Sequence, residues 1–189
     1  MRQNHISRYF LTGFAAVIVA GNLEAALPER QGWWATFDLG FGFLHQRIDG
    51  IAIDDSTFYL GAGVGYAVTP NFLAGIEFNG WSIQPSNELF AEPGDPPEGE
   101  AIAQYLVVAR LYPSSESKLY AKLGAGYARH WNLRWGEESR SGTCFQLGVG
   151  YHVFVQRGLS MTPAVSYSFG TVGNEDYQAF TLSVGLAWD

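Results

Sequence analysis

Apolar and polar residues alternate along most of the chain with a period of two, as expected for β-strands with one apolar face. The alternation is clearest over residues 58–68, where Phe, Leu, Val and Tyr side chains share one parity and glycines fill most of the other. A turn at Thr69-Pro70-Asn71 leads to a second alternating segment, residues 72–82, in which Glu77 lies on the face of small residues. The two segments predict a β-hairpin.

Six further segments alternate in the same way, which gives eight predicted strands: residues 33–44, 58–68, 72–82, 102–112, 119–131, 144–155, 159–170 and 177–188. Residues 69–71, 113–117 and 156–158 are predicted as short turns, and residues 45–57, 85–100, 132–143 and 171–176 as longer connections. An even number of strands with turns at one end and longer loops at the other is typical of outer-membrane barrels. The pattern therefore predicts an all-β fold, an eight-stranded antiparallel transmembrane β-barrel with up-and-down meander topology.

The alternative is a soluble eight-stranded barrel of lipocalin type, in which the apolar residues point into the lumen. Residue size favours the membrane interpretation, because glycine and alanine dominate one parity and an eight-stranded lumen is narrow. Charged residues also lie on the small-residue parity: Asp38, Glu77, Arg110 and Lys122. We therefore expect the large apolar side chains to face lipid.

The amino terminus differs from the rest of the chain. Arg2 and Arg8 precede an apolar run, residues 10–20, and a small-residue stretch near Ala25, which predicts a secretory signal peptide over residues 1–25 and a barrel domain over residues 26–189. A retained amphipathic anchor is the alternative. Removal of the leader would move the net charge from −7 to about −8, which argues against nucleic acid as a partner.

Composition agrees with a strand-rich, exported chain. The sequence holds 23 glycines and 15% aromatic residues, which favours many short strands and turns. Cys144 is the single cysteine, so no intrachain disulfide can form. Stability would then come from closure of the sheet, which leaves no edge strand unpaired.

The charged residues on the small-residue parity are predicted to form a network in the lumen: Asp38, Glu77, Arg110 and Lys122. Strands carrying Glu77, Arg110 and Lys122 follow one another, so the three side chains can meet. A buried network of this kind can be a salt-bridged plug, in which loss of one partner costs several kcal/mol. It can also be a gate whose rearrangement opens a narrow pore.

Two further sets of residues are predicted to lie near the membrane surfaces. Residues 85–100 hold four prolines and five acids, which predicts an extracellular acidic loop: Glu88, Glu92, Asp95, Glu98 and Glu100. The default is a solvated loop, and binding of divalent cations or an adhesive surface is the alternative. Aromatic residues near the predicted strand ends suit interfacial girdles: Trp33, Trp34, Trp81, Trp131 and Trp188.

No catalytic or metal site is predicted, and no cofactor. A Ser two residues after a His would suggest nucleophilic catalysis on lipid A, but His45 and His130 lack one. His130 could meet Ser139 or Ser168 through folding alone. His45 with Asp54 and Asp55 could hold a cation, although a solvated loop explains them equally well.

Residues 60–78, LGAGVGYAVTPNFLAGIEF, and 119–129, LYAKLGAGYAR, together with the eight-strand plan, resemble the small outer-membrane barrels of the OmpA transmembrane-domain, OmpX and OmpW group and porin-family surface antigens. The resemblance implies a Gram-negative envelope protein located in the outer membrane, with both termini in the periplasm. It also implies partners, namely outer-membrane lipid, lipopolysaccharide, the barrel-assembly machinery, and host or surface ligands at the long loops. Such barrels usually end in an aromatic residue, whereas here Asp189 follows Trp188.

These observations predict a non-enzymatic barrel with a largely plugged lumen and a structural or surface-interaction role. The alternatives are a narrow pore for small solutes and a lipid A-modifying enzyme.

Overall fold

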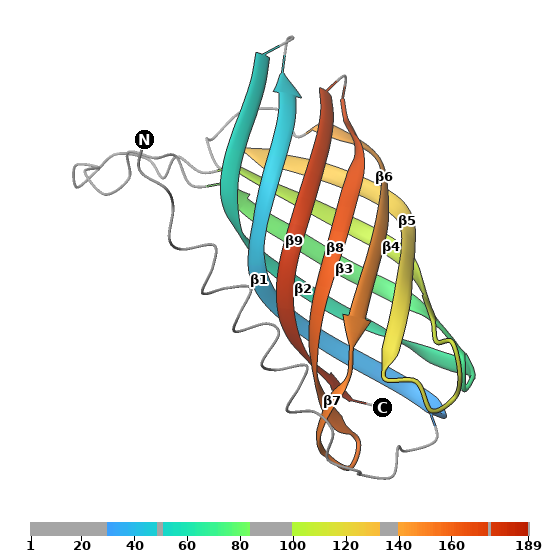
Figure 1. Ribbon diagram of the computed structural model, residues 1–189. Coiled ribbons are helices and arrows are strands. Elements are labelled where there is room, and N and C mark those ends of the chain that lie inside the picture. The colour runs from blue at the N-terminus through green and yellow to red at the C-terminus, as the bar shows by residue number, and fades with distance from the viewer. Residues whose placement is uncertain (1–29, 49–50, 84–99, 133–139, 174, 189) are drawn as a thin grey trace, which may run out of the picture.

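The chain forms a β-barrel in the computed structural model, which describes residues 30–48, 51–83, 100–132, 140–173 and 175–188 (Figure 1). The strands are β1 Gly32–Ile48, β2 Ile51–Thr69, β3 Phe72–Ile83, β4 Glu100–Leu111, β5 Leu119–Asn132, β6 Arg140–Tyr151, β7 Val153–Gln156, β8 Leu159–Val172 and β9 Glu175–Trp188. The described residues contain no helix long and apolar enough to cross a membrane.

All pairings are antiparallel and join strands that follow one another in sequence, apart from β6 and β7, and the sheet closes where β1 pairs with both β2 and β9. β6 and β7 both pair with β8 and are separated by His152 alone, so they form one barrel strand with a break. The result is the predicted fold, a closed eight-stranded antiparallel meander.

Two connections are shorter than the sequence analysis predicted. β1 and β2 stay paired up to Ile48 and Ile51, so residues 45–57 form a long hairpin extension in place of the predicted loop. β8 and β9 likewise stay paired up to Val172 and Glu175. Pairing between the strands satisfies the backbone N–H and C=O groups of these polar segments.

The large apolar side chains point outward, as the size argument predicted. Phe41, Ile76 and Val107 are 59%, 62% and 69% exposed, while polar side chains of the opposite parity are buried in the lumen. This arrangement is inverted relative to a soluble barrel and matches a barrel surrounded by lipid. The predicted signal peptide, residues 1–25, lies outside the described residues.

Candidate functional site in the barrel lumen

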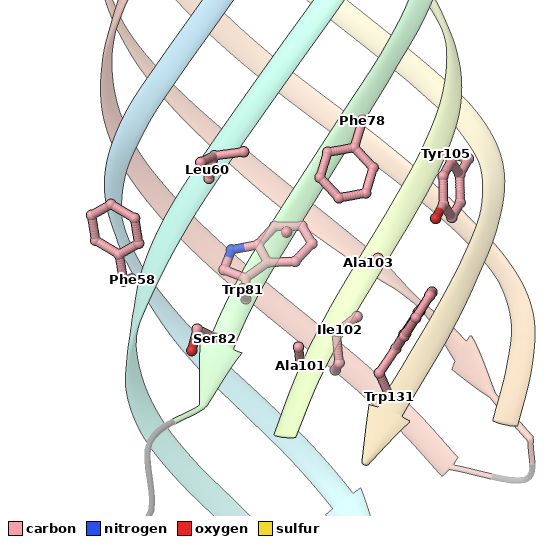
Figure 2. Close-up of a pocket in the computed structure, with 11 residues that line it drawn as sticks. Phe58, Leu60, Phe78, Trp81, Ser82, Ala101, Ile102, Ala103, Tyr105 and Trp131 are labelled. Carbon is pink, nitrogen blue, oxygen red and sulfur yellow. The ribbon is translucent and has the colours of Figure 1, made fainter. Parts of the chain in front are cut away.

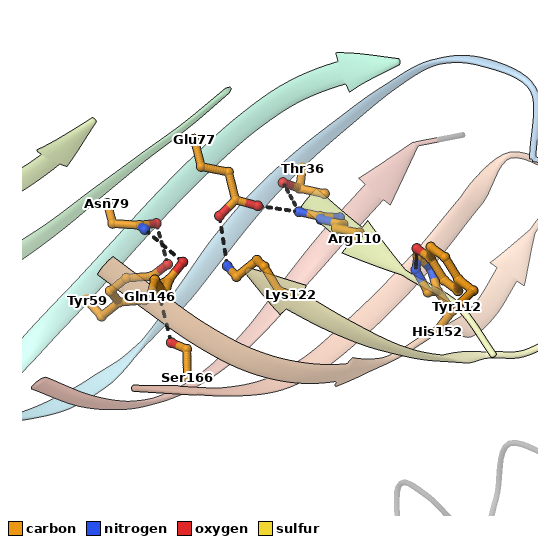
Figure 3. Close-up of polar contacts among 10 residues, drawn as sticks. All are labelled: Thr36, Tyr59, Glu77, Asn79, Arg110, Tyr112, Lys122, Gln146, His152 and Ser166. Carbon is orange, nitrogen blue, oxygen red and sulfur yellow. Dashed lines mark hydrogen bonds and ion pairs between the residues drawn. The ribbon is translucent and has the colours of Figure 1, made fainter. Parts of the chain in front are cut away.

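The midsection of the lumen contains a cluster of charged side chains from adjacent strands. Glu77 on β3 accepts from Arg110 Nη2 at 2.6 Å through Oε1 and from Lys122 Nζ at 2.7 Å through Oε2. Arg110 and Lys122 are direct cross-strand partners on β4 and β5. All three side chains are buried, so each cation neutralises part of the same carboxylate away from solvent (Figure 3).

Arg110 is held on several sides at once. Its Nη2 also donates to Thr36 Oγ1 at 3.2 Å. Its guanidinium lies 4.2 Å from the ring centroid of Trp34 and 5.3 Å from that of Tyr120, within the range of cation–π attraction. The planar guanidinium therefore has both in-plane acceptors and aromatic faces, a combination that lysine cannot reproduce.

Asp38, the fourth predicted member, is buried in the same region but is not brought into the ion pairs. Within the described lumen, neither Arg110 nor Lys122 lies within ion-pair distance of its carboxylate. The side chain instead lies against Gly185, its cross-strand partner on β9, where a β-carbon would come within 2.1 Å of Asp38 Oδ1. Asp38, Arg110 and Lys122 line a small cavity of about 10 Å³, roughly the space that one water molecule needs.

A second polar layer lies on the side of the cluster toward the β3–β4 connection. Tyr59 Oη donates to Asn79 Oδ1 at 2.6 Å, and Asn79 Nδ2 donates to Gln146 Oε1 at 3.4 Å. Gln146 Nε2 continues the chain to the hydroxyls of Ser166 and Ser168 at 3.5 and 3.3 Å. The network crosses the lumen from β2 to β8 (Figure 3).

A third layer lies further along in the same direction. Trp81 Nε1 donates to Thr181 Oγ1 at 3.1 Å, and Gln104 Nε2 donates to Tyr177 Oη at 2.6 Å. Trp81 and Gln104 are both fully buried. Large side chains thus occupy the lumen at this level too.

The opposite end of the lumen is closed by aromatic rings around His152, at the break between β6 and β7. Nε2 of His152 lies 3.0 Å from Tyr112 Oη (Figure 3). Nδ1 of His152 lies 2.7 Å from Ser160 Oγ. Arg30 stacks on Tyr112, with 3.7 Å from Cζ to the ring centroid, and donates to the backbone carbonyls of Ser115 and Ser117. The guanidinium fastens the residues before β1 to the β4–β5 turn.

Some of the predicted aromatic residues lie inside the barrel. Trp34 and Trp81 are 2% and 0% exposed and point into the lumen, so their assignment to interfacial girdles was wrong. They share strand parity with Asp38 and Glu77. There the Trp34 ring packs against the Arg110 guanidinium, and the Trp81 indole donates to Thr181. Trp33, Trp131 and Trp188 lie on the outer surface.

The predicted acidic loop falls mostly outside the described residues: Glu88, Glu92, Asp95 and Glu98. Glu100 is the first residue of β4 and was wrongly assigned to the loop, since its backbone pairs with β3 and β5. Among the described residues, no group of three or more potential ligands could hold a metal ion.

The His152–Ser160 contact and the role of Arg30 were missed by the sequence analysis. The turn predicted at residues 156–158 could have revealed the first, because a hairpin there pairs residue 154 with residue 160 and so makes residue 152 a diagonal neighbour of residue 160. The predicted alternative partner of His130, Ser168, interacts with Gln146 instead, and Ser139 lies outside the described residues.

The closed meander, its lipid-compatible surface and its polar lumen define a small transmembrane β-barrel. The family model described as outer membrane protein beta-barrel domain matches residues 12–189, so the chain belongs to this family and is a protein of the bacterial outer membrane. No curated protein matches the sequence.

Solved structures share the fold at low sequence identity. Neisserial surface protein A is similar with a TM-score of 0.57 and 14% identity, over 83% of this chain and 96% of that protein. Ail, the attachment invasion locus protein of Yersinia pestis, is similar with a TM-score of 0.50 and 16% identity, over 84% of this chain and 99% of Ail. At these identities the likeness supports the fold alone.

Proposed function

We propose that the protein is a closed outer-membrane barrel that supports membrane integrity and surface interaction. In this proposal residues 1–25 are a cleaved signal peptide, and both termini and the short turns face the periplasm. The connections at residues 84–99 and 133–139 then face outward and form the surface available to host or other ligands. The family's fold and the shortness of the opposite turns support this orientation.

The observation that carries the proposal is the filling of the lumen at successive levels. The His152 ring cluster, the Glu77 ion pairs and the Tyr59–Asn79–Gln146 network follow one another along the barrel (Figure 3). The layer that contains Trp81 comes next in the same direction. Each level is made of buried side chains joined by hydrogen bonds or ion pairs, which makes it costly to disrupt. A solute would have to displace all of them.

Reconstitution into planar lipid bilayers tests the closed lumen. We expect the folded wild-type protein to insert without persistent single-channel steps. Reproducible steps from protein that is folded, as shown by its shift between unheated and boiled gel samples, would reject the closed barrel.

A narrow pore is the second candidate, and Asp38 is the observation that favours it. This carboxylate lies beside the cavity that Arg110 and Lys122 also line, yet ion-pairs with neither. A shift of Lys122 from Glu77 to Asp38 would be an exchange of partners inside the lumen. Steps in the wild type that disappear in Asp38→Asn would favour this gate.

The proposal assigns no enzymatic activity. The Ser160–His152 pair is buried among aromatic rings, with Ser160 1% and His152 0% exposed, so a lipid substrate has no path to the hydroxyl in this conformation. Mass analysis of lipid A after incubation with the folded barrel should show no change in acylation. Loss or gain of an acyl chain that depends on Ser160 would overturn this assignment.

The proposal also names the barrel-assembly machinery as the partner that inserts the chain. β9 ends with outward-facing Trp188, followed in sequence by Asp189. Replacement of Trp188 by Ala should lower the amount of folded protein in the outer membrane, whereas removal of Asp189 should not.

A further inference from the structure

A small cavity lies between the charged cluster and the wall of the lumen that β6, β8 and β9 form. Its volume is about 10 Å³, roughly the space that one water molecule needs. Small residues leave this space open, because Gly148 on β6 has no side chain and Ala164 on β8 has only a methyl group. Polar side chains line much of the remainder: Asp38, Arg110, Tyr120, Lys122, Ser166 and Ser183.

Asp38 is the residue of this lining that most needs a hydrogen-bond donor. Its side chain is 8% exposed, and within the described part of the barrel no hydrogen bond reaches its carboxylate. A buried carboxylate without hydrogen bonds is costly, since it has lost its hydration and gained nothing in return. The cavity beside Asp38 provides room for a donor.

Lys122 lines the same cavity and has donors to spare. Its ammonium group carries three N–H donors, and one of them goes to Glu77 Oε2 at 2.7 Å (Figure 3). The cross-strand partner of Lys122 on β6 is Gly148, so no side chain from that position fills the space next to it. With the nearby serine hydroxyls, the cavity offers the two to four polar partners that a buried water molecule requires.

We propose that this cavity holds one buried water molecule, which donates to the carboxylate of Asp38 and accepts from the ammonium group of Lys122. The water joins Asp38 to a cation that already pairs with Glu77. It satisfies Asp38 without any exchange of ion-pair partners. The inference rests on the proposed closed lumen, since a conducting lumen would hold exchangeable water along its whole length.

The balance of charge selects a neutral ligand for this site. In their ordinary charged forms, the two carboxylates of Asp38 and Glu77 balance the two cations of Arg110 and Lys122, and all four side chains are buried. A metal ion in the cavity would lie beside two cations and leave an uncompensated positive charge in the lumen. An anion would lie beside Asp38 and leave an uncompensated negative charge.

The polar lining distinguishes this cavity from the hollows on the outer surface of the barrel. The hollow over β3 and β4 has a volume of about 480 Å³ and apolar walls that include Phe58, Phe78 and Tyr105 (Figure 2). Such a hollow suits membrane hydrocarbon, because water would find few polar partners in it. The cavity in the lumen has the opposite character, since it is both water-sized and polar.

Crystal structures of the folded barrel, purified in detergent from outer membranes, test the site at a resolution that shows ordered water. Ser183→Val fills the cavity, because one methyl group replaces the hydroxyl and the other adds volume. Ser183→Thr is milder, since it adds one methyl group and keeps the hydroxyl. Thr162→Val is the matched control, because it removes a buried hydroxyl that lies beside Asp38 without lining the cavity.

We expect the wild type and Thr162→Val to show one density peak within hydrogen-bond distance of both Asp38 and Lys122, with contacts of about 2.8 Å to oxygen. Ser183→Val should remove the peak, and Ser183→Thr should lower its occupancy. Crystals soaked in rubidium chloride should show no anomalous signal in the cavity, because the ligand is water and not a monovalent cation.

An empty cavity in the wild type, a peak that Ser183→Val leaves unchanged, or a rubidium signal at the peak would overturn the water site. If Ser183→Val does not fold, Ser183→Thr decides in the same way. The closed lumen is read separately in planar bilayers. Persistent steps with the peak in place would reject the closed lumen alone, and a silent barrel without the peak would reject the water site alone.

Discussion

At the residue scale, the decisive feature is that one carboxylate, Glu77, serves two buried cations. Each of its oxygens has its own partner, Arg110 or Lys122, so removal of the carboxylate leaves two positive charges in a narrow lumen. Removal of a single cation leaves an ion pair behind. The cost of substitution should therefore depend on which member is changed.

Glu77→Gln tests this asymmetry. The neutral amide strands both Arg110 and Lys122, and we expect a loss of about 3–5 kcal/mol in the free energy of unfolding, with a smaller loss for Lys122→Met. Urea titration of the refolded barrel in lipid measures both values, and the exposed turn variant Glu116→Gln is the control. A loss below about 1 kcal/mol in Glu77→Gln would show that water or another group replaces the carboxylate.

Arg110→Ala is expected to weaken the barrel in a different assay. It removes the cation that pairs with Glu77 Oε1 and that also lies over the face of Trp34. The unboiled, folded band should then convert to the unfolded band at a lower temperature than in the wild type, on gels loaded after stepwise heating. An unchanged conversion temperature would remove Arg110 from the account of stability.

At the scale of elements, strand parity located all eight barrel strands from the sequence, because a lipid-facing surface forces alternation across the membrane. It failed where the hairpin of β1 and β2 extends beyond the alternating region, since His45, Asp54 and Asp55 on these strands were assigned to a loop. Trp34 and Trp81 were misplaced for another reason: residue type was weighed above parity, although parity alone places both beside Asp38 and Glu77.

The contacts that required the structure join residues far apart in sequence. Tyr59 reaches Gln146 through Asn79, and Trp81 reaches Thr181 across the lumen. Strand parity predicts that these side chains face inward. The height of each side chain along the barrel axis depends on the stagger of the strands and on side-chain length, which parity does not give. The charged cluster was easier to anticipate, because β3, β4 and β5 are neighbours and opposite charges attract.

The break between β6 and β7 should depend on the hydrogen bonds of His152. Replacement by Ala leaves the hydroxyls of Ser160 and Tyr112 without this partner, and we expect a loss of about 1–3 kcal/mol. A double-mutant cycle with Ser160→Ala, followed by urea unfolding, isolates the contact, with exposed Gln156→Ala as the control. Additive losses would mean that the 2.7 Å contact contributes nothing of its own.

At the scale of the whole molecule, the barrel is closed by several layers in series, and no single layer needs to seal it. The ion-pair cluster differs from the layers on either side, because those layers are held by neutral hydrogen bonds and by ring packing, to which Arg30 adds a cation over Tyr112. A gate confined to Glu77, Arg110 and Lys122 would therefore open onto lumen that is still filled. Conductance of a variant without the charged cluster therefore separates a plug from a gate more sharply than conductance of the wild type.

The triple variant Glu77→Ser, Arg110→Ser and Lys122→Ser removes the three ion-paired side chains together, and Asp38→Asn is added so that no carboxylate stays buried beside them. Because the Trp81 and His152 levels remain, we expect planar bilayers to show no persistent steps, as for the wild type. Tyr59→Ser with Trp81→Ala, which trims the adjoining layers and keeps the ion pairs, is the matched control and should also stay closed. Steps in the combined variant alone would show that the other layers let ions pass, and that the charged cluster is the gate of a narrow pore.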